Sequence, residues 1–311
     1  LIISPFFLLP LINNLLITIL SITLKQKPTP KLNLQELPDN AKTMVILPTF
    51  IADEKAAISA VNKIKELQSS NKGKNISFAL LIDYKKSKYE KDVSDCDLNK
   101  KISSKLIGFS DINIFVRKRV KQGKVYTAFE RKRGAILDLC ECLLTENTEK
   151  FAYIMREEIQ KPTFIATLDD DNCLLPNTIF NSVCRMLHPL NKKYDLMTFK
   201  TKYDLYSMNT LYGKRYYFDC GYSRYLPSNS FYYNFFGKGI YCGKGIFRLQ
   251  EYYTKLNNLF PSNRILSHDI IEGSILKTGE LPEVAFENAP NSIPSEIARH
   301  NRWFKGDMLL G

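Results

Sequence analysis

From residue 43 onward, short apolar runs alternate with segments whose apolar residues have helical spacing. The runs that predict strands lie at 43–47, 76–82, 112–116, 164–168 and 196–199. Between the first two runs, Asp53 is placed to cap a helix whose apolar face is Ile58, Val61, Ile64 and Leu67. Such alternation is typical of an α/β fold with a mostly parallel central sheet, covered by helices on both faces. Residues 85–105 are polar and rich in lysine, and we predict a surface excursion there.

The first 24 residues contain no charged side chain. At about 1.5 Å per residue, a helix of this length crosses a hydrocarbon core of about 30 Å. We therefore predict a transmembrane helix at 1–24, although Pro5, Pro10, Asn13 and Asn14 interrupt its apolar character. A signal peptide would need a basic start and a small-residue cleavage site, which this segment lacks. A buried core helix is the other alternative.

Three lysines, Lys25, Lys27 and Lys31, follow the apolar segment. The positive-inside rule then places the rest of the chain in the cytoplasm. Prolines in 25–42 predict a short stiff linker, and 43–311 is predicted to form one catalytic domain. Because the chain starts without methionine and stops inside an apolar run, we expect it to be a piece of a longer protein.

Lysine and arginine outnumber aspartate and glutamate by 44 to 32, which gives a net charge of +12. This surplus favours an anionic partner such as a nucleotide, a nucleic acid or a membrane surface. No recognised nucleic-acid-binding motif accompanies the charge, so we predict no nucleic-acid partner. The apolar fraction of 44% excludes wholesale disorder. The 7 cysteines form no C-x-x-C pair, which excludes a zinc or disulfide framework.

Carboxylates follow two of the predicted strands directly. Asp83 comes after 76–82, and Asp169-Asp170-Asp171 comes at the end of 164–168. Ligands of open α/β sheets bind at the carboxyl ends of strands, where these side chains are expected. Neighbouring carboxylates repel each other, and a hard divalent cation relieves the repulsion. The pattern predicts Mg²⁺ or Mn²⁺ bridging a diphosphate, although a solvated acidic turn is an equally simple alternative.

Arg131-Lys132-Arg133-Gly134 opens a predicted helix that continues over 134–144. Cations in a first helical turn oppose the helix dipole, so a bound phosphate would explain them. An ordinary basic surface is the alternative. Gly237-Lys238-Gly239 and Gly243-Lys244-Gly245 do not fit the phosphate-loop pattern and receive no role.

Two further motifs lie towards the end of the chain. Asp269 begins a predicted helix, where an ionised carboxylate could accept a proton from a sugar hydroxyl or simply cap the helix. Arg299 and Arg302 share one helix face, and Trp303 beside them could stack on a sugar ring. A core tryptophan flanked by surface charges is the alternative reading.

Taken in order, these motifs resemble the D, D-x-D, D, (Q/R)-x-x-R-W series of processive family 2 glycosyltransferases. A closer resemblance is to the glucosyltransferase domain of cyclic β-1,2-glucan synthases, glycosyltransferase family 84. The stretches that carry it are TMVILPTF, FALLIDY, ERKRG, TLDDDNCLLPNT, MLHPLN, GKGIYCGKGIF, FPSNRILSHDIIEG and RHNRWFKGD. The resemblance implies a GT-A-like, Rossmann-like nucleotide-sugar transferase fold. It also implies a bacterial inner-membrane enzyme that faces the cytoplasm and makes β-1,2-glucan from UDP-glucose.

The resemblance also implies a role for each motif. Asp269 would be the catalytic base, and Asp169 and Asp171 would hold the metal. The substrate-binding residues would be Asp83 at the uridine, Arg131, Lys132 and Arg133 at the diphosphate, Asp170 at the sugar nucleotide, and Arg299, Arg302 and Trp303 at the diphosphate and acceptor. The partners would be UDP-glucose, a glucan acceptor that this family builds on the protein itself, and membrane lipid.

These implications favour an inverting β-glucosyltransferase, because an α-linked donor gives a β-linked product in one displacement. A processive β-glycosyltransferase with another linkage or sugar, such as a cellulose-like chain, is the first alternative. The second is a membrane-anchored module that binds a glycan or nucleotide without catalysis. Intact carboxylates at all three motif positions count against the second alternative.

Overall fold

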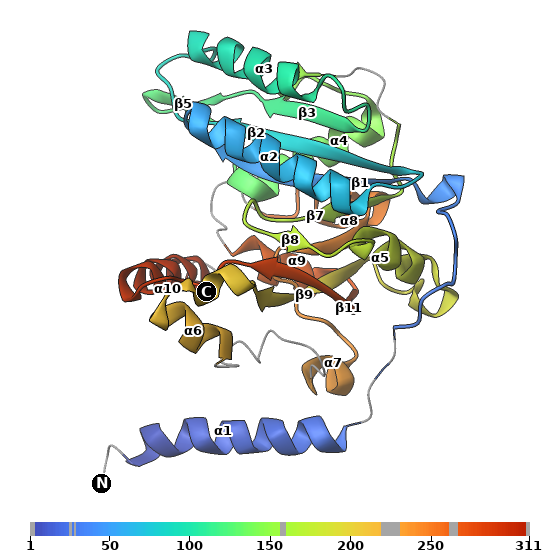
Figure 1. Cartoon of the computed structure of the whole chain (residues 1–311), viewed down its shortest axis with the longest axis vertical. Helices are drawn as coiled ribbons and strands as arrows, with labels where there is room; N and C mark the ends of the chain where they lie inside the picture. Colours follow the sequence, from blue (N-terminus) through green and yellow to red (C-terminus); the bar gives the residue numbers. More distant parts are fainter. Residues whose placement is uncertain are drawn as a thin grey trace.

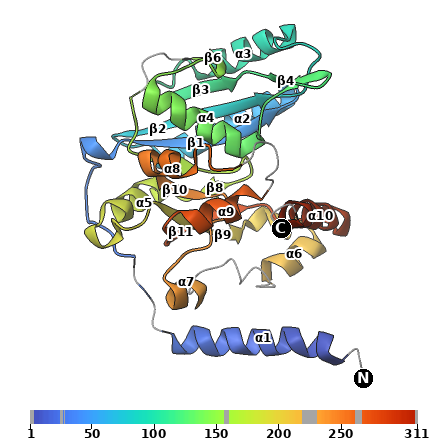
Figure 2. The same cartoon turned by 180° about the vertical axis from the view of Figure 1, so that it is seen from behind.

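The computed structural model of the chain describes residues 4–24, 27, 29–155, 160–218, 231–260 and 267–308. Within them, a nine-stranded mixed sheet forms the centre of the molecule. Helices α2 and α3 cover one face of the sheet (Figure 1), and α4 and α8 cover the other (Figure 2). The strands of this sheet are β1 (Thr43–Ile51), β2 (Ile76–Tyr84), β3 (Ile112–Arg117), β6 (Phe151–Ile154), β7 (Phe164–Thr167), β8 (Cys173–Leu174), β9 (Leu196–Tyr203), β10 (Gly245–Arg248) and β11 (Thr278–Glu287).

A separate hairpin consists of β4 (Val120–Gln122) and β5 (Val125–Thr127). The α-helices are α1 (Ser4–Thr23), α2 (Glu54–Asn71), α3 (Val93–Leu106), α4 (Arg131–Thr145), α5 (Thr178–Leu187), α6 (Leu211–Phe218), α7 (Phe231–Phe236), α8 (Leu249–Leu256), α9 (His268–Ile275) and α10 (Ile293–Met308). Short 3₁₀ helices are η1 (Asp39–Ala41), η2 (Pro189–Asn191) and η3 (Leu205–Asn209).

The sheet has the strand order β6-β3-β2-β1-β7-β10-β9-β11-β8. Its longer ladders, β1 with β2 and β9 with β11, are parallel, as are β1 with β7 and β2 with β3. The antiparallel pairings of β10, β6 and β8 are short. The predicted α/β fold with a mostly parallel sheet is therefore confirmed.

Two apolar cores lie on opposite faces of the sheet. Successive residues of a strand point to opposite faces, so Val45 and Leu47 of β1 pack with α2, α3 and α5. Met44 and Ile46 of the same strand pack with α4 and α8. This double burial explains why the strands read as continuous apolar runs, and it fixes the carboxyl ends of β1, β2 and β7 against each other.

Residues 85–105 differ from the predicted surface excursion, because their second half forms α3. Asp92 accepts a hydrogen bond from the backbone N–H of Ser94, and the side chain of Asp95 accepts one from the N–H of Asp92. This capping box starts the helix, and burial of Ile102 and Leu106 against the sheet holds it there.

The N-terminal segment forms the helix α1, which lies apart from the sheet near α7 (Figures 1 and 2). However, in the described part of the chain no helix has both the length and the apolarity that crossing a bilayer requires. The transmembrane character predicted for 1–24 is therefore not shown by the described residues. Lys25, one of the lysines on which the expected cytoplasmic orientation rests, lies outside the described residues.

Candidate active site

Asp83 and Asp169 lie at the same edge of the sheet, as their positions after strands predict. Asp83 is the penultimate residue of β2, and Asp169 follows the end of β7 closely. Both strands flank β1 and run parallel to it, so their carboxyl ends meet. This edge is where ligands bind in open α/β sheets.

Arg117, at the end of β3, fixes the carboxylate of Asp83. Its Nε donates to Oδ1 at 2.7 Å and its Nη2 donates to Oδ2 at 2.6 Å. Its Nη1 also donates to Asp138 of α4 at 3.0 Å. The Arg117 side chain is only 2% exposed, so this is a buried network with one cation between two carboxylates. Asp83, the predicted uridine contact, is therefore oriented by a neighbouring strand.

The same arginine holds the turn that starts α4. Its guanidinium donates to the carbonyl oxygens of Phe129 and Arg131, at 2.8 and 3.0 Å. Glu130 and Arg131 both have positive φ, at 55° and 46°. At Gly134 an added Cβ would lie 2.4 Å from the Phe129 carbonyl oxygen, so glycine is required there. Arg117 thus joins Asp83 to the Arg131–Arg133 segment.

The three cations of this segment point to different places. Arg131 is exposed, whereas Arg133 is buried, bonds Glu130 at 3.0 Å and lies over the Phe260 ring. Lys132 donates to Oδ1 of Asp169 at 2.5 Å and to the carbonyl oxygen of Gly243 at 2.8 Å. Of the predicted diphosphate-binding residues, Lys132 is therefore the one that reaches the D-x-D carboxylates.

A second lysine, Lys244, also contacts Asp169. Its Nζ lies 3.4 Å from Oδ2 of Asp169 and bonds Glu287, the last residue of β11. Burial alone would raise the pKa of Asp169, but the ammonium groups of Lys132 and Lys244 outweigh burial and lower it to about 2. Asp169 is therefore held ionised by two cations.

Asp171 and Asp170 complete the acidic triplet. Asp170 is exposed, and Asn172 fixes the turn by accepting a hydrogen bond from the Asp169 N–H at 2.8 Å. Burial raises the pKa of Asp171, with Asp169 and Glu287 as further negative neighbours, although Lys244 opposes the rise. Asp171 thus sits in an excess of negative charge that an added cation would relieve.

Asp169 and Asp171 suit a metal ion that the protein binds together with the phosphates of its substrate. Across the described residues, no group of three or more His, Cys, Asp and Glu side chains is placed to hold an ion by itself. Mg²⁺, however, is usually bound through one or two carboxylates together with substrate phosphates and water. Asp169 and Asp171 supply two such carboxylates, and the unrelieved charge at Asp171 suits a cation.

Asp269 and Lys132 both lie close to Gly243. A Cβ built on Gly243 would be 3.6 Å from Lys132 Nζ and 3.9 Å from Oδ2 of Asp269. The predicted base is therefore brought next to the predicted diphosphate and metal residues. Burial raises the pKa of Asp269, and Glu272 adds to the rise, while His268 and backbone N–H groups oppose it. The backbone N–H groups at the start of α9 therefore favour the ionised form of Asp269, but burial has the larger effect and the pKa is raised overall.

His268 and Glu272 form a buried pair behind Asp269. His268 Nδ1 lies 3.1 Å from Oε1 of Glu272, whose side chain is 1% exposed. Burial lowers the pKa of His268, but the Glu272 carboxylate outweighs burial and raises it overall. Glu272 is therefore a buried partner of His268 and not an exposed carboxylate.

Helix α10 carries Arg299, Arg302 and Trp303, and two hydrogen bonds connect it to the segments next to Glu287 and Asp269. Arg299 donates to the Asn288 carbonyl oxygen at 3.1 Å, directly after Glu287, and its guanidinium lies over the Trp303 ring. Near its other end, Asp307 accepts from the Ser267 hydroxyl at 2.6 Å, two residues before Asp269. Trp303 is 39% exposed and Arg302 is exposed. Helix α10 is thus joined to the two segments that carry Glu287 and Asp269.

The residues that sequence reasoning did not assign are Arg117, Lys244 and Glu287. The Gly-Lys-Gly pattern around Lys244 is the signal that could have found one of them. It occurs twice, and Lys238 of the first copy donates instead to the carbonyl oxygen of Ser274.

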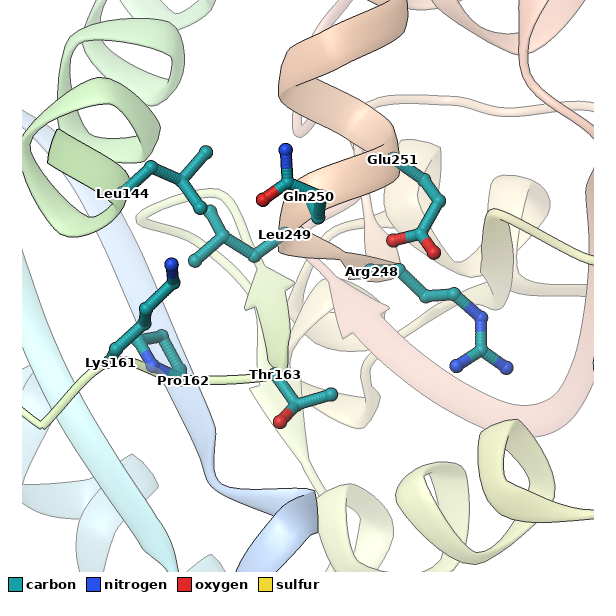
Figure 3. A pocket seen from close by; sticks show the side chains of 8 residues that line it. All are labelled: Leu144, Lys161, Pro162, Thr163, Arg248, Leu249, Gln250 and Glu251. Carbon is teal, nitrogen blue, oxygen red and sulfur yellow. The ribbon is translucent and has the colours of Figure 1, made fainter.

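A pocket of about 340 Å³ lies on the opposite edge of the sheet (Figure 3). It is lined by Leu144, Lys161, Pro162, Thr163, Arg248, Leu249, Gln250 and Glu251. Thr163 precedes the start of β7 and Arg248 ends β10, so the pocket is at the amino end of β7. It is therefore remote from Asp169, which follows the carboxyl end of the same strand.

The glycine between Lys132 and Asp269 gives a first prediction. In Gly243→Ala the added methyl group enters the space between these side chains, and we expect transfer to fall about 10- to 100-fold. Steady-state kinetics would measure the loss. Gly123→Ala is the matched control, because Gly123 also has positive φ, 62° against 76°, but its Cβ would meet nothing within 4 Å. Equal losses in both variants would contradict a role for Gly243 in the site.

Comparison with known proteins gives one related sequence and several distant folds. The chain is 25% identical over 307 residues to the cyclic β-(1,2)-glucan synthase NdvB of Rhizobium meliloti (strain 1021). The match covers 89% of this chain but only 11% of the relative, so the chain spans about a ninth of that protein's length. No family model matches the chain.

Two solved structures to which the chain is distantly similar are glycosyltransferases. The galactosyltransferase LgtC, with donor and acceptor sugar analogues, has a TM-score of 0.35 and 10% identity over 76% of this chain and 72% of its own. The bifunctional glycosyltransferase WbbM has a TM-score of 0.37 and 12% identity over 83% of this chain and 41% of its own. These likenesses are distant, and nothing below rests on them.

Proposed function

We propose that this chain is a glycosyltransferase domain that transfers glucose from UDP-glucose to a growing β-1,2-glucan, with inversion at the anomeric carbon. The observation that carries the proposal is the meeting of Lys132, Asp169 and Asp269 around Gly243, at the carboxyl edge of the sheet. The similarity to a cyclic β-(1,2)-glucan synthase supports the choice of sugar and linkage.

The donor diphosphate would lie against the ammonium groups of Lys132 and Lys244. Two fixed cations at one point suit the negative charge that develops on a leaving nucleoside diphosphate. Asp169 and Asp171 are the residues that would hold Mg²⁺ or Mn²⁺, which when bound neutralises the same leaving charge. Asp83, held by Arg117, is the candidate for the nucleoside end of the donor.

Asp269 is the candidate base. In an inverting transfer the acceptor oxygen bonds to the anomeric carbon as the bond to the diphosphate breaks, and the hydroxyl proton passes to the carboxylate. A carboxylate with a raised pKa accepts a proton more readily than one with the ordinary value. The exposed Trp303 on α10, with Arg302, would contact the acceptor glucan.

The raised pKa of Asp269 predicts how transfer depends on pH. Only the ionised carboxylate accepts the proton, so transfer should fall as pH decreases through this pKa. Because burial raises the pKa, the fall should begin at a higher pH than the ordinary aspartate value of about 4. A pH profile of kcat measures this, and a rate that stays flat down to about pH 4 would contradict it.

The experiment that tests the function is linkage analysis after incubation with labelled UDP-glucose and a divalent cation. The proposal predicts labelled glucan with β-1,2 linkages and release of UDP. A polymer with another linkage would support the alternative of a different processive β-glycosyltransferase. UDP-glucose binding without any transfer would support a non-catalytic binding module.

A further inference from the structure

We propose that Lys132 and Lys244 form an internal cation pair, which occupies Asp169 until the donor's diphosphate and its divalent ion arrive together. This deepens the proposed function and rests on it, because it concerns how the same site accepts its donor. It makes two predictions: the metal alone binds weakly, and the nucleotide strengthens metal binding.

The first step is that both lysines are fixed by the fold. Lys132 is anchored by the Gly243 carbonyl oxygen at 2.8 Å as well as by Asp169 at 2.5 Å. Lys244 is 9% exposed and bonds the buried carboxylate of Glu287. Each ammonium therefore has a second partner that keeps it near Asp169.

The backbone around Lys244 explains why two glycines flank it. Gly243 has a φ angle of 76°, a backbone conformation that residues other than glycine rarely adopt. A Cβ on Gly245 would lie 2.6 Å from the Met197 carbonyl oxygen, because β10 enters the sheet between β7 and β9 there. The two glycines let the chain bring Lys244 to the end of β7.

The second step concerns charge. A divalent ion that approaches Asp169 alone meets two ammonium groups within hydrogen-bonding or ion-pairing distance of that carboxylate. Like charges held this close to one carboxylate repel each other, so metal binding alone is disfavoured. A diphosphate changes the balance, because its oxygens accept hydrogen bonds from both lysines and release Asp169 to the ion. Metal and nucleotide binding should then be positively coupled.

The test measures Mn²⁺ binding to the chain by electron paramagnetic resonance, with and without UDP. Lys132→Met and Lys244→Met are each expected to tighten binding of Mn²⁺ alone by about tenfold or more, and to reduce the gain that UDP produces. Lys244→Arg keeps the charge and should keep Mn²⁺ alone weakly bound. Lys238→Met is the matched control from the first Gly-Lys-Gly copy and should leave Mn²⁺ affinity unchanged.

Lys244→Met removes the partner of the buried Glu287 and can destabilise the fold, so Lys132→Met decides the question if that variant does not fold. The proposal is overturned if the folded variants bind Mn²⁺ alone within about twofold of the wild-type affinity. Because this readout needs no glucose transfer, a chain that shows the coupling but transfers no sugar would contradict the proposed function alone.

Discussion

Asp269→Asn is expected to reduce glucose transfer by at least about 100-fold while UDP-glucose affinity stays near the wild-type value. Asparagine keeps the size of the side chain but cannot accept the hydroxyl proton. Asp269 lies beside Gly243 and Lys132, so its carboxylate is close to where the donor diphosphate would bind. Single-turnover kinetics and isothermal titration calorimetry would measure rate and affinity separately.

Asp97→Asn, an exposed change of the same type on α3, is the control for effects of charge alone and should leave both values unchanged. Trp303→Ala should instead weaken acceptor binding through lost stacking. If Asp269→Asn retained transfer but lost UDP-glucose binding, Asp269 would be a donor contact and the assignment of the base would be wrong.

Arg117→Met is expected to lower the free energy of unfolding by about 3–5 kcal/mol. The substitution leaves Asp83 and Asp138 without their shared cation in a region where Arg117 is nearly inaccessible. It also frees the Phe129 and Arg131 carbonyl oxygens, so UDP affinity of the folded fraction should fall as well. Denaturant unfolding followed by circular dichroism measures the loss.

Lys101→Met is the matched control for this experiment, because Lys101 and Glu54 form an ion pair at 2.7 Å with both side chains more than half exposed. Exposed pairs contribute about 0–1 kcal/mol, so little change is expected. If Arg117→Met cost no more than this surface pair, the buried network would not be what holds Asp83.

The strands that could be predicted from the sequence are those whose signals are local. The run at 76–82 is apolar except for Ser77 because both faces of β2 are buried, and the helix cap at Asp53 is visible in the printed sequence. β10 and β11 were not predicted, since Gly245–Arg248 is short and the polar residues of β11 become acceptable only through pairing with distant strands. The positions of Asp83 and Asp169 follow from the strands, because Asp83 is near the carboxyl end of β2 and Asp169 closely follows β7.

The cations of the candidate site show where sequence reasoning stops. Lys238 and Lys244 occupy identical Gly-Lys-Gly surroundings in the sequence. Only the insertion of β10 between β7 and β9 carries Lys244, and not Lys238, to Asp169. Arg117 and Glu287 are likewise assigned by pairing between strands far apart in the chain, which no local pattern records.

The helical nature of the N-terminal segment could be predicted from the sequence, since α1 forms over Ser4–Thr23 within the uncharged stretch 1–24.

The most direct test of the central claim is a crystal structure of the chain with UDP and Mn²⁺. The proposal predicts that the diphosphate lies between Lys132, Lys244 and Asp169, within hydrogen-bonding distance of both ammonium groups, with the ion at Asp169 and Asp171. It also predicts that the Asp269 carboxylate faces the end of the diphosphate that would carry the sugar. UDP bound at the opposite edge of the sheet, beside Arg248 and Glu251, would contradict the account.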